Sequence, residues 1–216
     1  MVQDCDGFVR PWRLDVLRFY DLLHPQLVSS AAICSGVSLT FESDCEELAL
    51  DYTNASLFHG CAFDLIVDGV ATPAKSIPAV APLPPGLSGE DKAALMRRHP
   101  RASSPPNAVA RWSGLGSERK RLEIWLPHAV AMRYHALRVP PTATVSRVAD
   151  DRPVWCVYGS SLTQCAEAET PLATWPARVA RRADLRLRNL GFSGACQGGK
   201  RVSDSHRSRE LRDLKS

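Results

Sequence analysis

The stretch Val154–Cys165 reads VWCVYGSSLTQC, an apolar run that ends in a glycine and two adjacent serines. Val154–Tyr158 has the composition of a fully buried strand, as found in parallel sheets. Gly159, Ser160 and Ser161 follow this strand directly. A serine in this place can be a turn residue, a helix cap or a nucleophile held at the carboxyl edge of a sheet. The neighbouring sequence has to decide among these roles.

The residues after the serines predict a βαβ unit. Thr174 is expected to begin a helix, because Pro176 suits its first turn and the alanine-rich ARVARRA follows. Leu185–Gly191 (LRLRNLG) has the composition of a second strand. Strand, helix and strand within roughly forty residues form a parallel unit. Residues 149–196 are therefore predicted to open an α/β domain.

Short alternating runs upstream predict β-structure. Polar turns such as Asp68-Gly69 separate the runs, and no helix alternates with them. This pattern predicts an all-β sandwich of the jelly-roll type over residues 1–148, so that the chain has two domains. The expected strands are Gly36–Phe41, Glu47–Tyr52, Ala62–Val67, Arg121–Leu126 and Tyr134–Val139.

Two segments do not have this strand pattern. Residues 71–116 hold half of the sixteen prolines, so we expect an insertion that no regular strand crosses, with one short helix at Ser88–Arg98. Residues 197–216 are polar and rich in Gly, Ser and Arg, which predicts a disordered tail. A short helix could form in this tail near Ser208–Leu214.

Composition argues against several classes of partner. The net charge of +4 is mild, and no aromatic residue follows Phe192 in the basic tail, so nucleic-acid binding is not expected. No apolar run approaches the roughly 20 residues that span a bilayer, and the N-terminus has no apolar signal region. We therefore expect a cytoplasmic protein that does not bind membranes. The seven cysteines form no CxxC pair, so neither a metal site nor a cofactor is expected.

The segment from Val154 to Cys196 resembles the opening of an SGNH (GDSL-like) hydrolase. Gly159-Ser160-Ser161-Leu162 is similar to the first block of the family, with Ser160 where Asp is more common. Asn189-Leu190-Gly191-Phe192-Ser193-Gly194 is similar to the second block. The resemblance implies a flavodoxin-like α/β domain in which Ser161 is the nucleophile. It also implies that Gly194 donates its backbone N–H to the oxyanion beside the Ser161 N–H, with Gly159, Ser160 and Asn189 in support.

The strands upstream, in GVSLTFESDCEELALDY, AFDLIVDG and LEIWLPH, resemble the β-sandwich that precedes the hydrolase domain in one branch of this family. Later blocks of the family supply an Asn and a D-x-x-H pair. After Gly194 the chain has no Asn, and its single His lies in Asp204-Ser205-His206. The chain is therefore expected to be truncated after the second block, with impaired activity.

The implied activity is that of an esterase on small acyl or acetyl esters, which acts through an acyl-enzyme. The expected substrate is a small ester, of a carbohydrate or of a natural product. Three alternatives remain: an acyltransferase of the same family, an inert fragment whose sandwich binds carbohydrate or a partner, and a frameshifted gene product.

Five further side chains have a structural and a chemical interpretation each. His128, at the end of a predicted strand, could face the cleft, but we expect a turn or domain-interface histidine. Cys165 and Cys196 follow the two blocks and are expected to pack rather than react. Trp125 and Trp175 are expected to be core or interface anchors rather than surfaces for ligand stacking.

Overall fold

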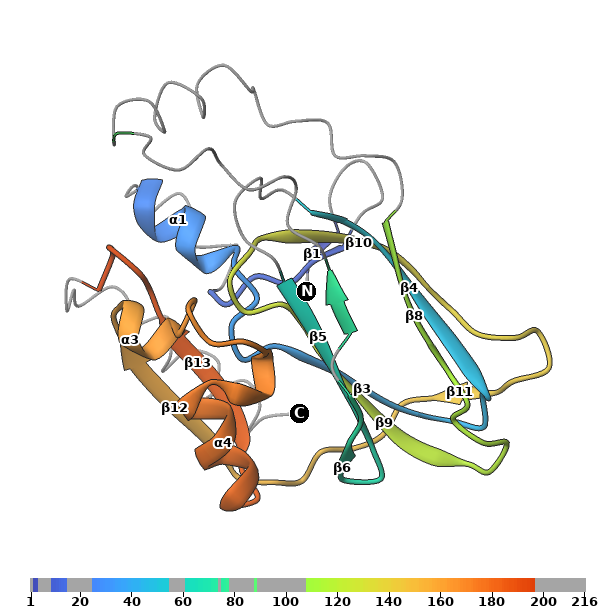
Figure 1. The fold of residues 1–216 in the computed structure, drawn as a ribbon. Helices are drawn as coiled ribbons and strands as arrows, with labels where there is room; N and C mark the ends of the chain where they lie inside the picture. Colours follow the sequence, from blue (N-terminus) through green and yellow to red (C-terminus); the bar gives the residue numbers. More distant parts are fainter. Residues whose placement is uncertain are drawn as a thin grey trace.

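The computed structural model describes residues 2–3, 9–14, 25–54, 61–73, 75–77, 88 and 108–196 (Figure 1). Two antiparallel sheets make up most of this part of the chain, and a small α/β segment lies beside them. No helix in the described ranges is long and apolar enough to cross a membrane. The helix predicted at Ser88–Arg98 lies outside these ranges apart from Ser88, and the predicted tail at 197–216 lies entirely outside them.

The first sheet has five strands in the order β1-β2-β10-β4-β8. The second has six, in the order β11-β3-β9-β5-β6 with β7 paired to β5. The strands of the first sheet are β1 (Val2–Gln3), β2 (Val9–Arg10), β4 (Glu47–Asn54), β8 (Ala108–Ser113) and β10 (Met132–Arg138). Those of the second are β3 (Ser38–Ser43), β5 (Cys61–Val67), β6 (Val70–Ala71), β7 (Lys75–Ile77), β9 (Lys120–Trp125) and β11 (Val145–Ser146).

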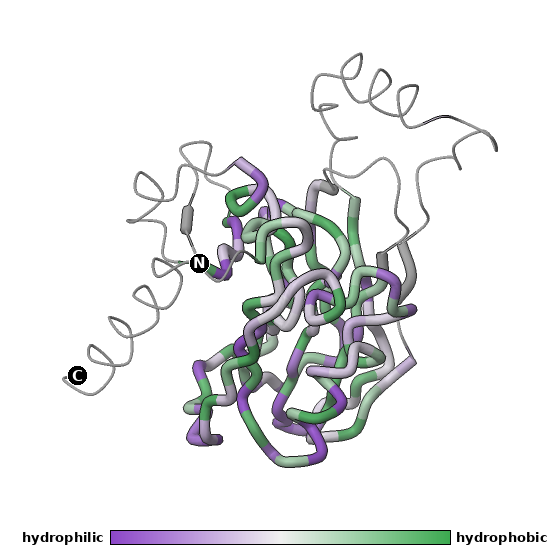
Figure 2. Tube along the Cα trace, turned by 90° about the vertical axis from the view of Figure 1, so that its left-hand side faces the viewer, coloured by the Kyte–Doolittle hydropathy of each residue, from purple (hydrophilic) through white to green (hydrophobic). Residues whose placement is uncertain are grey.

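One apolar core lies between these sheets. It takes Leu50 and Trp112 from the first sheet and Phe63 and Ile124 from the second, because alternate residues of a strand point to the same face. Hydrophobic and hydrophilic residues alternate accordingly along the trace (Figure 2). The ring of Phe63 is fully buried and meets three other aromatic rings edge-on. Such contacts between large apolar side chains fix the separation of the two sheets.

Strand β8 corrects the expectation that no strand would cross residues 71–116. The prolines of that segment end at Pro106, and apolar and polar residues alternate from Ala110 to Ser113 in the AVARWS that follows. Ala110 and Trp112 are buried, and β8 pairs with β4 along its whole length. The proline count described only the middle of the segment, since β7 also lies within it.

The predicted βαβ unit is confirmed in its connectivity, but its first strand is not fully buried as expected: Val154 and Tyr158 are exposed, because the described part of this sheet has only two strands. Strand β12 (Val154–Gly159) pairs in parallel with β13 (Arg186–Gly191), so that Gly159 lies opposite Gly191. Thr174 is the N-cap residue of the connecting helix, and Pro176 lies in its first turn. The elements between the strands are α3 (Ser161–Gln164), the 3-10 turn η2 (Pro171–Ala173) and α4 (Trp175–Arg182).

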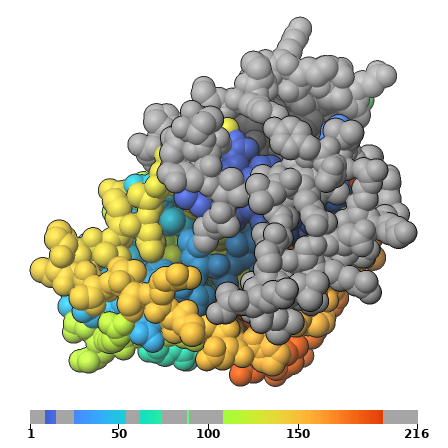
Figure 3. Space-filling model, turned by 180° about the vertical axis from the view of Figure 1, so that it is seen from behind, coloured from blue at the N-terminus to red at the C-terminus, as the bar shows by residue number. Residues whose placement is uncertain are grey.

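Contacts join the α/β segment to the rest of the chain. Leu14 and helix α1 (Pro25–Ala31) pack on Leu190 and Phe192 in one apolar cluster. Trp125 packs with Leu172 and other residues in a second cluster, which confirms it as an interface anchor. The connection from β10 to β12 runs across the surface, where β11 pairs with β3 (Figure 3). The division into domains at residue 148 stays a prediction, and these contacts cross it.

Candidate active site

Ser161 lies where strand β12 gives way to helix α3. The preceding Ser160 occupies the N-cap position, but its side chain makes no capping hydrogen bond. Ser161 is exposed, and its hydroxyl has no hydrogen-bond partner within the described part of the chain. The one-turn helix ends at Cys165, whose φ of 57° is left-handed. Neither serine therefore serves as a side-chain helix cap.

Gly194 lies in the turn that follows strand β13. Its φ is 69°, and the N–H of Ala195 closes the turn on the carbonyl of Phe192 at 3.1 Å. The N–H of Phe192 also donates to the carbonyl of Gly159 at 2.8 Å, so both turns leave from the same edge of the parallel pair. Among the described residues, no hydrogen bond uses the N–H of Ser161 or of Gly194. The structure thus brings a serine and two available amides to one sheet edge.

The two turns pack closely because each strand ends in a glycine. A Cβ placed on Gly191 would lie only 2.6 Å from the carbonyl carbon of Thr163 and would also collide with the backbone nitrogen of Gln164. A Cβ on Gly159 would collide with the side chain of Thr163. Any larger residue at Gly191 would push α3, and with it Ser161, away from the edge.

Asn189 is buried and links three parts of the site. Its side-chain nitrogen donates to the carbonyl of Thr163 at 2.9 Å and to the hydroxyl of Ser35 at 3.0 Å. Its side-chain oxygen accepts the N–H of Gly191 at 2.7 Å. Ser35 in turn donates to the carbonyl of Gln164 at 2.8 Å. Asn189 therefore holds helix α3 against the end of β13.

Arg13 extends this buried network from the N-terminal segment. Its guanidinium donates to the carbonyls of Asn189 at 3.2 Å, Gly191 at 2.6 Å and Ser30 at 2.5 Å, and it lies 4.8 Å from the ring centre of Phe192. Burial lowers the pKa of Arg13 to about 10. No carboxylate forms an ion pair with it among the described residues, so carbonyl dipoles and the ring stabilise its charge.

Sequence reasoning missed Arg13, Ser30, Ser35 and Gln164. Gln164 is almost fully buried, and its side-chain oxygen accepts the N–H of Ser193 at 3.0 Å. No local signal marked it, because its partner lies 29 residues away in the sequence. The other three act across large separations along the chain, which periodicity does not reveal.

His128 is an interface histidine, as expected, and its hydrogen bond does not go to the serine turn. Its Nε2 bonds the carbonyl of Ala168 at 3.0 Å, while its buried Nδ1 has no partner within the described residues. His135 bonds Thr53 instead. Of the histidine side chains that the structure describes, none therefore contacts the hydroxyl of Ser161.

Acidification is expected to destabilise the protein through His128. Burial lowers the pKa of His128, so the unfolded chain takes up the proton first as the pH falls. The stabilising contribution is complete above the ordinary histidine value of about 6.5 and is lost as the pH falls through the folded pKa. Urea unfolding between about pH 7.5 and pH 5 should show a weaker pH dependence for His128→Leu than for the wild type. Equal slopes would show that His128 does not titrate on unfolding.

The remaining predicted residues pack locally. The Sγ of Cys165 lies 2.9 Å from the carbonyl of Leu162, and burial raises the pKa of this thiol. Cys196 is also a free thiol. Trp175 is half exposed, meets the ring of Trp155, and donates its indole N–H to the carbonyl of Leu162 at 2.9 Å. It therefore ties the start of α4 to α3.

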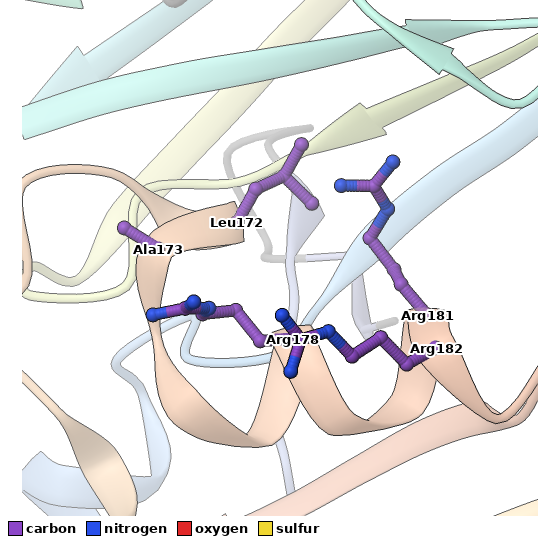
Figure 4. A pocket seen from close by; sticks show the side chains of 5 residues that line it. All are labelled: Leu172, Ala173, Arg178, Arg181 and Arg182. Atoms are coloured by element: carbon purple, nitrogen blue, oxygen red, sulfur yellow. The ribbon is translucent and has the colours of Figure 1, made fainter.

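A separate pocket of about 470 Å³ lies between η2 and α4 (Figure 4). Arg178, Arg181 and Arg182 point into it from one side of α4. Leu172 and Ala173 line the opposite side, and no residue of the serine turn takes part. Within the described residues, no group of His, Cys, Asp and Glu could hold a metal ion.

Residues 152–210 match the family model of the GDSL-like Lipase/Acylhydrolase family. The resemblance of the serine segment to the SGNH (GDSL-like) hydrolases is therefore confirmed over these residues. No curated protein sequence matches the chain significantly.

Solved structures share the fold over most of this chain. The salicylyl-acyltransferase SsfX3 from a tetracycline biosynthetic pathway is 26% identical with a TM-score of 0.70, over 89% of this chain and 49% of that one. A protein described as a GDSL-like lipase from Bacteroides ovatus is 18% identical with a TM-score of 0.63, over 90% and 54%. A family two carbohydrate esterase from Clostridium thermocellum, in complex with cellohexaose, is 15% identical with a TM-score of 0.53, over 87% and 52%. The last two similarities show the fold alone, and the chain spans about half the length of all three proteins.

Proposed function

We propose that the chain carries the nucleophile and the oxyanion donors of an SGNH-type enzyme that acts on small acyl esters. The observation that supports this most directly is the edge of the β12–β13 pair. There the exposed hydroxyl of Ser161 has no hydrogen-bond partner among the described residues. The backbone N–H groups of Ser161 and Gly194 at the same edge also donate no hydrogen bond within these residues. The match of residues 152–210 to the GDSL-like Lipase/Acylhydrolase family model supports the same chemistry.

In the proposed reaction, the Oγ of Ser161 attacks the carbonyl carbon of the ester. The N–H groups of Ser161 and Gly194 donate to the oxygen that becomes negative, an arrangement that stabilises tetrahedral intermediates in acyl transfer. The C–O bond to the alcohol then breaks, and the alcohol leaves with the proton that Ser161 gave up. Water attacks the acyl-enzyme, which releases the acid and restores the serine.

This proton needs a base to carry it. A serine hydroxyl is a weak nucleophile near neutral pH unless an adjacent base activates it. The sequence predicts no such base, since the family's D-x-x-H pair is missing, and the single histidine after Gly194, His206, lies outside the described residues. With the base removed, oxyanion donors and binding alone retain about 10³-fold catalysis over water in serine hydrolases.

Labelling with a fluorophosphonate tests the proposal on the full chain. Attack by the Oγ of Ser161 forms a P–O bond, breaks the P–F bond and releases fluoride, with the proton passing to solvent. We expect a single adduct on Ser161 by peptide mass spectrometry, no adduct in Ser161→Ala, and retained labelling in Ser160→Ala. Ser160 is the matched control, because it is the exposed neighbouring serine of the same turn. Folded wild-type protein that takes up no label at Ser161 would refute the proposal.

Acyl transfer to an alcohol is the second candidate, and the similarity to SsfX3 favours it. The same acyl-enzyme serves both reactions, since only the final nucleophile differs. An aryl acetate incubated with a simple alcohol should give acetylated alcohol in excess of acetic acid if transfer is the function. Acetic acid as the sole product would favour hydrolysis.

A further inference from the structure

The hydroxyl of Ser30 reaches the turn that carries Gly194. Ser30 lies on helix α1, is buried, and donates its O–H to the carbonyl of Ser193 at 2.9 Å. That carbonyl belongs to the same peptide unit as the N–H of Gly194. In a trans peptide the C=O and N–H point in opposite directions within one plane. A hydrogen bond that fixes the carbonyl of Ser193 therefore also fixes the direction of the Gly194 N–H.

Two glutamine side chains contact the rest of this turn. The N–H of Ser193 donates to the side-chain oxygen of Gln164 at 3.0 Å, which holds the preceding peptide unit. Gln26, four residues before Ser30 on α1, lies against Gly194, since a Cβ there would be 3.0 Å from its side-chain nitrogen. One face of α1 thus covers the turn.

Ser30 is itself held in place. The guanidinium of Arg13 donates to its backbone carbonyl at 2.5 Å, and its side chain is enclosed by packing. The hydroxyl of Ser30 therefore has little conformational freedom. A group that orients a catalytic donor to within a fraction of an ångström must itself be fixed in this way. Its hydrogen bond also polarises the Ser193–Gly194 peptide, and this makes the Gly194 N–H a stronger donor.

We propose that Ser30 is a positioning residue for acyl transfer at Ser161. It directs the Gly194 N–H to the site of the developing oxyanion. This inference rests on the proposed function, because it assigns a role to the peptide unit that supplies one of the two oxyanion donors. It places part of the catalytic geometry in the N-terminal segment, 131 residues before the nucleophile in the sequence (161 minus 30).

The second-order rate constant for fluorophosphonate labelling of Ser161 tests the inference, since the probe develops charge on an oxygen in the position of the oxyanion. We expect Ser30→Ala to lower this constant by about 10-fold to 100-fold, because a misplaced donor loses most of its effect. Ser29→Ala is the matched control. Ser29 is the neighbouring residue of the same helix, and its hydroxyl bonds only the carbonyl of Gln26 among the described residues. Its labelling constant should stay at the wild-type value.

Ser30→Thr keeps the hydroxyl and should recover a large part of the rate, which a purely packing role would not predict. Ser30→Cys keeps the approximate size of the side chain, but its thiol is a weak hydrogen-bond donor. If the alanine variant does not fold, the cysteine variant should show the same fall in the labelling constant. Wild-type labelling constants in folded Ser30→Ala and Ser30→Cys would overturn the inference while leaving the proposed function intact. Wild-type protein without label at Ser161 would instead refute the proposed function, and the inference with it.

Discussion

Gly191→Ala should destabilise the protein by about 3 kcal/mol or more, at the upper end of the cost of inserting atoms into a packed site. The added Cβ would lie 2.6 Å from the carbonyl carbon of Thr163 and would collide with the backbone nitrogen of Gln164 as well. Backbone atoms cannot rotate away as a flexible side chain does, so relief requires α3 to move as a whole. Urea unfolding followed by circular dichroism gives the free energy of unfolding.

Gly69→Ala is the control for this substitution. Gly69 has a φ of 82°, and no atom lies within 4 Å of the position of an added Cβ. Alanine there bears only the backbone strain of a left-handed residue, about 1–2 kcal/mol. A loss in Gly191→Ala no greater than in Gly69→Ala would mean that the two turns do not pack as described. Hydrogen exchange of residues 161–164 should rise in Gly191→Ala and stay unchanged in Gly69→Ala.

Arg13→Met is expected to cost about 3 kcal/mol. Methionine fills much of the volume of the arginine stem but donates no hydrogen bond. The carbonyls of Asn189, Gly191 and Ser30 then lose a charged donor, and a buried acceptor without its partner costs about 1–3 kcal/mol. Removing the buried charge offsets part of this loss, because burial disfavours the guanidinium in the folded state. Because one guanidinium serves three carbonyls, the loss of these hydrogen bonds is expected to outweigh the gain from removing the buried charge.

Arg13→Lys separates charge from geometry in the same measurement. Lysine keeps the charge, but its single ammonium group cannot span three carbonyls as the planar guanidinium does. We expect its free energy of unfolding to fall between those of the wild type and Arg13→Met. A methionine variant more stable than the wild type would show that the desolvation cost dominates.

The elements that local pattern determines could be predicted from the sequence. Strand β12, the turn at Gly159 and the helix that begins after Thr174 follow from a short apolar run, a glycine and a proline, all within a few residues of the feature they shape. The predicted strands of the sandwich likewise fall within two residues of β3, β4, β5, β9 and β10. Strand β8 was missed, because nearby prolines outweighed a short alternating run at Ala110–Ser113.

The support of the serine turn could not be predicted in this way. Arg13 and Gly191 are 178 residues apart in the sequence, and Ser30 and Ser193 are 163 apart. A buried polar residue is recognisable only when its partners are known, and nothing in PWRLD or QLVSSA distinguishes these side chains from solvated ones. The family resemblance marked the residues that would touch substrate, Ser161 and Gly194. Of the residues that hold them, it marked Asn189 but not Arg13, Ser30, Ser35 or Gln164.

The attachment of Arg13, Ser30 and Ser35 to the far end of the chain bears on how such proteins can recombine. A gene segment that begins at residue 149 would encode the serine and both glycines of the strand ends, but not Arg13, Ser30 and Ser35, which support the Gly191–Ala195 turn from outside that segment. A chimaera that joins this α/β half to a foreign sandwich would need residues 13–35 from the original chain. The segment that would have to be exchanged therefore does not coincide with the domain predicted to begin after residue 148.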